Sequence, residues 1–100
     1  MAILTETNLA VGARVRLAYR IGGCFPGAMY EIDPGPTGTV VALFDEAARR
    51  ENGGVIAHIC FDEPIEDLEE WQNRLHVWRG GKDDPEIGDA VLSDFELAGF

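Results

Sequence analysis

The sequence predicts a small all-β domain, a five-stranded barrel with a long first loop and at most short helical turns. Several short runs are rich in β-branched and aromatic residues, and many alternate apolar with polar side chains, as half-buried strands do. Turn sequences containing Gly and Pro separate these runs. A chain of 100 residues suits one domain with one modest core, so residues 1–100 are expected to form a single domain.

The first strand is predicted over residues 13–20. There Val15, Leu17 and Tyr19 alternate with residues that include three arginines, which gives one apolar face and one basic face. Residues 1–8 before this strand show no clear period, and they are expected to be a loose lead-in.

The long first loop is predicted over residues 21–34, because this segment contains Gly-Gly, Pro-Gly and Asp-Pro pairs, which are typical of turns. A short extended piece is expected inside it, at residues 28–32. Long loops in compact domains are often functional, so this loop is a candidate binding edge.

The central strand is predicted over residues 39–44. Both of its faces are largely apolar, so it needs cover on both sides. Residues 45–54 indicate a turn with one helical turn at 46–50, and Asn-Gly-Gly at its end supplies the positive φ that a reversal needs. Residues 55–61 then return as an antiparallel strand, which completes a β-hairpin.

The second half of the chain is predicted to contain a helical turn near residues 64–70 and a strand over 73–78. An acidic pair before a proline suits a helix start, and apolar residues then recur at helical spacing. Residues 80–84 are expected to form a polar turn, and residues 90–92 and 96–98 close the domain. The core is expected to draw on Val15, Leu17, Val40, Ala42, Ile59, Phe61, Leu75, Val77 and Leu97.

The charge is unevenly distributed along the chain. Residues 1–44 carry three arginines and three carboxylates, whereas residues 45–100 carry fifteen acidic and five basic residues, an excess equal to the whole net charge of −10. Because binding to a phosphate backbone requires lysine and arginine, this surface should repel nucleic acid. Acidity also keeps a small protein soluble, which is the simpler interpretation of the charge.

One acidic run is dense enough to be a candidate binding surface. Within residues 62–70 six positions of nine are carboxylates. Such a run is either a solvated loop or a docking surface for a basic partner, whose association it would steer electrostatically. The candidate binding residues are Asp62, Glu63, Glu66, Asp67, Glu69 and Glu70.

A rival binding site is an aromatic groove built from Tyr19, Tyr30 and Trp78. Large aromatic residues in a small barrel are more often core residues than ligand contacts. Trp78 falls on the strand face shared with Arg74 and His76, so an exposed indole there would indicate a partner surface.

Neither metal binding nor catalysis has a supporting pattern. His58 and Cys60 would point the same way from a strand. His76 and Cys24 are further zinc-type ligands, but no Cys-x-x-Cys or His-x₃-His spacing accompanies them. We therefore expect no metal, no cofactor and free thiols. Ser93 is the only serine and lies in an acidic bend without a nearby histidine, so no catalytic site is expected.

From residue 9 to residue 98 the chain resembles SH3-like barrel domains of the KOW and Tudor kind. The matching segments are residues 11–15, 35–41, 59–62 and 92–97, which read VGARV, GPTGTVV, ICFD and LSDFEL. The resemblance implies a small barrel, and it implies little about function because this fold has many unrelated roles.

Two narrower resemblances concern function. The acidity, the length and the segment GTVVALFD at residues 38–45 are similar to acidic SH3-like antirepressors of myxobacteria, which imitate DNA to occupy the recognition helix of a repressor. The size is also similar to that of type II dihydrofolate reductases, tetramers of SH3-like subunits, but their Val-Gln-Ile-Tyr strand is not found here. Small barrels of this sort also occur in mobile gene cassettes.

The sequence therefore predicts a non-catalytic protein-binding module whose acidic surface binds a protein with a basic surface, as a DNA mimic or a regulatory adaptor. The alternatives are peptide or small-ligand binding in the aromatic groove, and a small oligomeric enzyme. Self-association is expected, because the central strand is apolar on both faces and an open barrel leaves edges that can pair. The start resembles no signal peptide and no apolar run reaches membrane-spanning length, so a cytoplasmic location away from membranes is expected.

Overall fold

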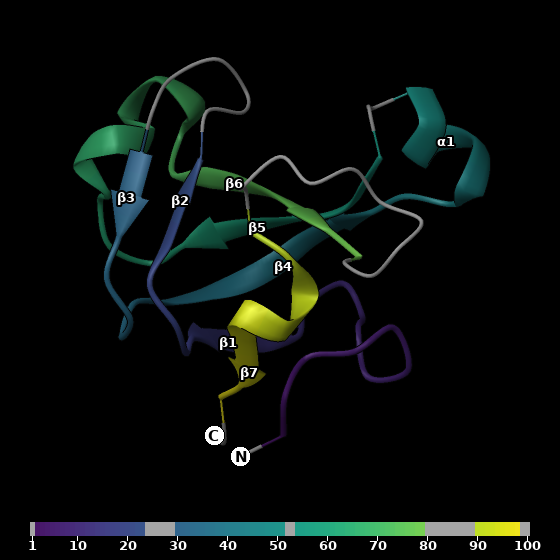
Figure 1. Cartoon of the computed structure of the whole chain (residues 1–100), viewed down its shortest axis with the longest axis horizontal. Helices are drawn as coiled ribbons and strands as arrows, with labels where there is room; N and C mark the ends of the chain where they lie inside the picture. The colour runs from purple at the N-terminus through teal and green to yellow at the C-terminus, as the bar shows by residue number, and fades with distance from the viewer. Residues whose placement is uncertain (1, 24–29, 52–53, 80–89, 99–100) are drawn as a thin grey trace.

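The computed structural model describes residues 2–23, 30–51, 54–79 and 90–98. Within these residues, seven strands, one short α-helix and two 3-10 helices make a mostly β domain, as predicted (Figure 1). The elements in order are β1 (Arg14–Leu17), β2 (Ile21–Gly23), β3 (Tyr30–Ile32), β4 (Thr37–Leu43), α1 (Glu46–Glu51), β5 (Val55–Phe61), η1 (Glu66–Trp71), β6 (Arg74–Trp78), η2 (Leu92–Asp94) and β7 (Phe95–Leu97).

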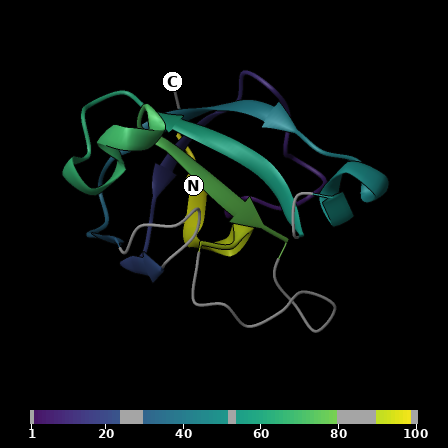
Figure 2. The same ribbon diagram turned by 90° about the horizontal axis from the view of Figure 1, so that it is seen from above.

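Five of the strands form one antiparallel sheet in the order β6-β5-β4-β1-β7, and β2 pairs with β3 in a separate hairpin. The sheet twists so that β1 and β7 run across the direction of β4, β5 and β6 (Figure 2). In the described part of the chain no strand ladder joins β6 to β7, so a closed barrel is not formed there. The prediction of a five-stranded barrel is therefore confirmed only as a small domain built on a five-stranded antiparallel sheet.

The predicted hairpin around the turn at residues 45–54 is confirmed. Strands β4 and β5 pair antiparallel, and α1 occupies the turn between them. The carboxylate of Asp45 accepts a hydrogen bond from the amide of Ala48 at 2.8 Å, which satisfies one of the amides left free at the start of a helix. Gly54 supplies the expected positive φ, at 99°. Helices α1 and η1 lie at opposite ends of β5 (Figure 1).

Strand β4 is central, as predicted, but its second half does not face the core. The register against β5 shifts between Val40 and Ala42, so that Val40 pairs with Ile59 while Ala42 pairs with His58. Such a bulge adds one residue to one strand and thereby reverses which side the following residues face. Ala42 is consequently half-buried on the outer side of the sheet, and its assignment to the core was wrong. The expected cover over both faces of this strand is likewise only partial.

The core lies on the inner side of the sheet. Seven of the nine residues expected in it are buried, and Leu97 is half-buried against them. The sequence did not identify several other buried residues, which include Leu4, Leu68, Ala90 and Phe95. Residues 2–8 form no strand, yet the amide of Leu4 donates to the carbonyl of Phe95 at 2.9 Å, so this segment is attached to the sheet.

Candidate protein-interaction surface

Helix η1 presents most of the acidic run, and apolar contacts hold it against the domain. A 3-10 helix repeats every three residues, so Leu68 and Trp71 share one side of it. Leu68 is 1% exposed and belongs to the core, whereas Trp71 is half-buried. Ile65, just before the helix, packs against the same core. The three-residue spacing of Ile65, Leu68 and Trp71, which predicted a helical turn here, therefore marks the side of the helix that faces the core.

A tight reversal after η1 fixes its other end. Gln72 and Asn73 both have positive φ, 57° and 60°, a conformation that asparagine tolerates better than most residues. The side-chain oxygen of Asn73 accepts a hydrogen bond from the amide of Ile65 at 2.9 Å. The amide of Asn73 donates to the carbonyl of Leu68 at 3.1 Å. These bonds join the two ends of the segment, so η1 is a fixed element.

The exposed carboxylates of this segment fall into two groups. Glu63, Glu66 and Glu69 are exposed, and no basic side chain of the described residues lies within ion-pair distance of them. Asp67 is also exposed, but it accepts a hydrogen bond from the amide of Glu31 at 3.2 Å and so connects η1 to β3. Glu70 belongs to η1, and its side chain lies outside what the structure describes.

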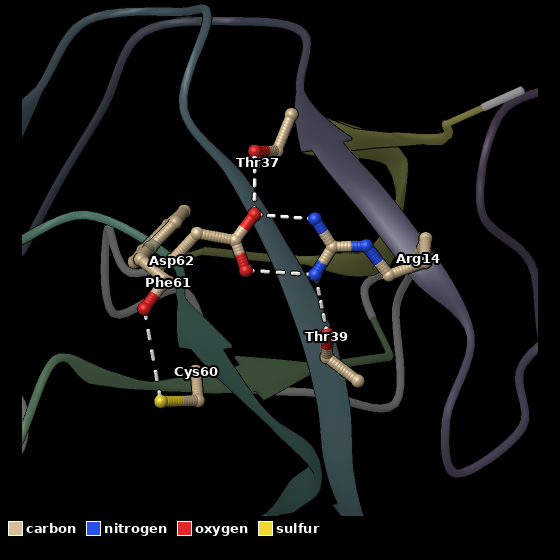
Figure 3. Close-up of polar contacts among 6 residues, drawn as sticks. All are labelled: Arg14, Thr37, Thr39, Cys60, Phe61 and Asp62. Atoms are coloured by element: carbon tan, nitrogen blue, oxygen red, sulfur yellow. Dashed lines mark hydrogen bonds and ion pairs between the residues drawn. The ribbon is translucent and has the colours of Figure 1, made fainter. Parts of the chain in front are cut away.

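Asp62 has a structural role instead (Figure 3). Its two carboxylate oxygens face the guanidinium of Arg14 on β1, with Nη1 and Oδ1 2.7 Å apart, and it also accepts a hydrogen bond from the hydroxyl of Thr37 at 2.7 Å. Arg14 donates further to the hydroxyl of Thr39 at 2.6 Å. The hydrogen bonds from Arg14 and then Thr37 lower the pKa of Asp62 to about 2. Asp62 therefore joins the end of β5 to β1 and β4.

The three aromatic residues of the alternative site do not form a groove. Tyr30 and Trp78 are 3% and 2% exposed, whereas Tyr19 is 56% exposed. Trp78 is buried because its strand ends under residues 90 and 91: its amide donates to the carbonyl of Ala90 at 3.0 Å. A shallow depression elsewhere is lined by Ile3, Leu4, Thr5, Glu6, Arg79, Leu92 and Ser93, and Glu6 and Arg79 form an ion pair there.

Sequence reasoning named His58 and His76 as zinc-type ligands, but it did not predict that they meet in a cluster on the outer side of the sheet. His58 and His76 are opposite partners on β5 and β6, with ring centroids 4.2 Å apart, and the ring of Phe44 lies 4.9 Å from that of His58. Burial, followed by the charge of Arg74, lowers the pKa of His58, and burial followed by the charge of His58 lowers the pKa of His76 to about 4. Only the register between β5 and β6 reveals that these two histidines are neighbours, and this register cannot be read from the sequence.

The remaining zinc-type ligands do not complete a site. Cys60 is a free thiol whose Sγ lies 3.8 Å from the carbonyl oxygen of Phe61 and 3.7 Å from that of Gln72. Cys24 and the turn predicted at residues 80–84 lie outside the described residues. Among the residues described, no group of three or more His, Cys, Asp or Glu side chains is placed to hold a metal ion.

No protein-family model, curated protein or solved structure matches this chain. No related protein therefore indicates what the candidate surface binds. None of the helices in the described residues has the length and apolar character needed to cross a membrane.

Proposed function

We propose that this protein is a non-catalytic binding module and that the surface of Glu63, Glu66 and Glu69, here called the η1 acidic surface, binds a protein with a basic surface. The observation that carries the proposal is that these carboxylates lack basic partners among the described residues while the segment that bears them is fixed by Leu68 and Asn73. A solvated loop that only confers solubility has no need of such anchoring.

Fixed carboxylates favour binding for two physical reasons. Glu66 and Glu69 are one turn of η1 apart, so the two charges lie on the same side of the helix, about 6 Å apart along its axis. A basic partner would then relieve their mutual repulsion. Because the backbone beneath them is already ordered, less conformational entropy is lost on binding than with a flexible acidic tail. The net charge of −10 would also accelerate encounter with a cationic protein.

We propose that the fold is SH3-like. One support is the five-stranded antiparallel sheet, in which β1 lies between β4 and β7. Another is the long connection between β1 and β4, which contains the β2–β3 hairpin. These features match the expected five strands and long first loop.

A DNA-binding protein is the class of basic partner that we favour, with this protein acting as a DNA mimic or a regulatory adaptor. The support is that basic and acidic charges lie apart. Near β1, the side chains of Arg14, Arg16 and Arg20 are each paired with a carboxylate outside the η1 acidic surface, so these arginines do not neutralise that surface. Direct binding of nucleic acid is disfavoured by the same charge.

The test compares two variants of equal charge. In the first, Glu63, Glu66 and Glu69 are replaced by Gln. In the second, Glu6→Gln, Asp33→Asn and Glu51→Gln remove three exposed charges elsewhere, of which Glu6 and Asp33 are paired with Arg79 and Arg20. Binding of an arginine-rich peptide is measured by calorimetry at low and physiological salt. We expect the first variant to lose most of the binding and its salt dependence. The second should keep most of both at physiological salt, where surface charges are screened over about 8 Å; at ~0.01 M salt the screening length is about 30 Å, so distant charges contribute more there.

Equal losses in the two variants would contradict the proposal, because they would mean that only the net charge matters. For the DNA-mimic version, the same pair of variants is used to capture DNA-binding proteins from a lysate with duplex DNA as competitor. Capture that duplex DNA does not reduce would exclude mimicry and leave the adaptor version. Retention of every captured protein by the first variant would contradict both versions.

A further inference from the structure

The outer side of the β4–β5–β6 sheet carries both histidines of the chain. His58 and His76 are directly opposite each other in the antiparallel ladder between β5 and β6. Their ring centroids are 4.2 Å apart and the ring planes meet at 80°. Every imidazole of the protein is thus gathered at one point of a sheet.

Neighbouring groups hold the pair in place without closing it off. The ring of Phe44 contacts His58 edge-on, with centroids 4.9 Å apart and an angle of 71° between the planes. Both histidines are half-buried, so each ring is supported by the protein and still reaches solvent. Because the two residues belong to adjacent strands of one sheet, their separation is set by the backbone ladder and not by a flexible loop.

We propose that His58 and His76 together bind a divalent transition-metal ion of the type that prefers imidazole nitrogen, such as Zn²⁺ or Cu²⁺. Each ring supplies one nitrogen, and water occupies the remaining positions around the ion. The described residues assemble no group of three candidate ligands. The site is therefore open, and it should bind more weakly than a structural centre with four protein ligands.

The observed geometry is close to what two ligands require. Zinc–nitrogen bonds of about 2.0–2.1 Å place two ligating nitrogens on the order of 3 Å apart, a separation that ring edges can adopt when the centroids are 4.2 Å apart. Nδ1 of His76 is buried, so we assign Nε2 as the ligand atom of His76. The terminal torsion of histidine has a broad distribution, so the ring of His58 can turn a nitrogen toward the same side. Neutral imidazole is the form that binds such ions.

The charges around the site act in both directions. The net charge of −10 attracts cations to the protein as a whole. Arg74 lies two positions along the ladder, opposite Cys60, and its guanidinium opposes a cation at the pair. Arg74 is exposed, so its side chain can move away into solvent. Its replacement therefore gives a variant that keeps both ligands and should bind the ion at least as tightly.

The test uses metal-free full-length protein labelled with ¹⁵N and titrated with Zn²⁺ at pH 7.5. The resonances of both histidine rings should shift together and saturate at one ion per chain. His58→Gln and His76→Gln should each weaken binding by at least about tenfold, which corresponds to ~1.4 kcal/mol. Arg74→Gln, on the same side of the sheet, should bind at least as tightly as the parent.

A second readout identifies the ligands directly. In a variant with Cys24→Ser and Cys60→Ser, which removes thiol oxidation, bound Cu²⁺ should show coupling to two imidazole nitrogens in its electron paramagnetic resonance spectrum. Coupling to fewer than two nitrogens would overturn the proposal. Zn²⁺ shifts confined to carboxylates or the N-terminus would do the same, and so would equal competition by Mg²⁺. The titration of the unmodified chain decides the matter even where a histidine variant folds poorly.

Discussion

The arginines around β1 and the η1 acidic surface carry opposite charges and differ in how those charges are compensated. Arg14 pairs with Asp62, and Arg16 pairs with Glu96 on β7. Arg20 lies 3.0 Å from Glu31 and 3.5 Å from Asp33. Glu63, Glu66 and Glu69 have no such partners among the described residues. Charges near β1 therefore connect strands, whereas charges on η1 remain open to another molecule.

Asp62 shows that position in the sequence does not decide between these two roles. It belongs to the same acidic run as Glu63 and Glu66, yet it lies at the end of β5, where β4 and β1 bring Arg14 within reach. Glu63 and Glu66, just after it, are exposed and lie within ion-pair distance of no basic side chain of the described residues. What distinguishes them is distance from a basic side chain fixed by a neighbouring strand.

The largest effect is expected when η1 loses its anchor. Leu68→Ala should lower the free energy of unfolding by about 2–4 kcal/mol, because the leucine side chain is buried and leaves a cavity. Chemical denaturation measures this loss. Ile59→Ala is the matched control: it should cost a similar amount but leave the amide hydrogen exchange of η1 unchanged, whereas Leu68→Ala should accelerate it. A loss below about 0.5 kcal/mol for Leu68→Ala would mean that η1 is not held by the core.

A smaller effect is expected from removing one paired carboxylate. Asp62→Asn should shift the urea midpoint of unfolding downward, because Arg14 and Thr37 lose a charged acceptor that connects three strands. Glu66→Gln, which removes an unpaired charge from the neighbouring segment, should leave the midpoint unchanged or raise it. Equal downward shifts of the urea midpoint in the two variants would mean that Asp62 and Glu66 contribute equally to stability, which would contradict the difference between paired and unpaired carboxylates.

The same contrast should appear in the dependence of stability on pH. The pKa of Asp62 is lowered in the folded protein from 3.8 to about 2, so below pH 3.8 the unfolded chain takes up this proton first. The contribution of Asp62 is therefore complete above that pH, and it is lost as the pH falls toward 2. Urea unfolding of the parent and of Asp62→Asn across this window should show a steeper loss in the parent. Parallel curves would contradict the assignment of Asp62 to the Arg14 cluster.

The smallest effect concerns repulsion within η1. Glu66→Lys places a cation one turn from Glu69 and should stabilise the domain by about 0.2–0.5 kcal/mol at low salt, the range of surface pairs on a helix. High salt should remove the gain. Thermal unfolding at two salt concentrations measures it. A gain that persists at high salt would show that the two charges do not interact.

Much of the local structure could be predicted because it depends on neighbouring residues. The β4–β5 hairpin follows from two strand-like runs joined by a turn that ends in glycine, and η1 follows from Leu68 and Trp71 at helical spacing. The acidic run could be located in the same way. Its division into paired Asp62 and unpaired glutamates could not, because Arg14 is 48 residues away along the chain.

The sequence by itself determined the approximate positions of β1, β4, β5 and β6, which segment carries the acidic charge, and that the protein is mostly β; it did not predict β2, which lies in the expected loop. Alternation, turn residues and local spacing are encoded over a few positions, so they can be seen without the fold. The tertiary structure alone decided that Ala42 faces outward, that Trp78 is buried and that His58 meets His76. Each of these depends on strand register or on packing between distant segments, and a shift of one residue in register reverses which side every later side chain faces.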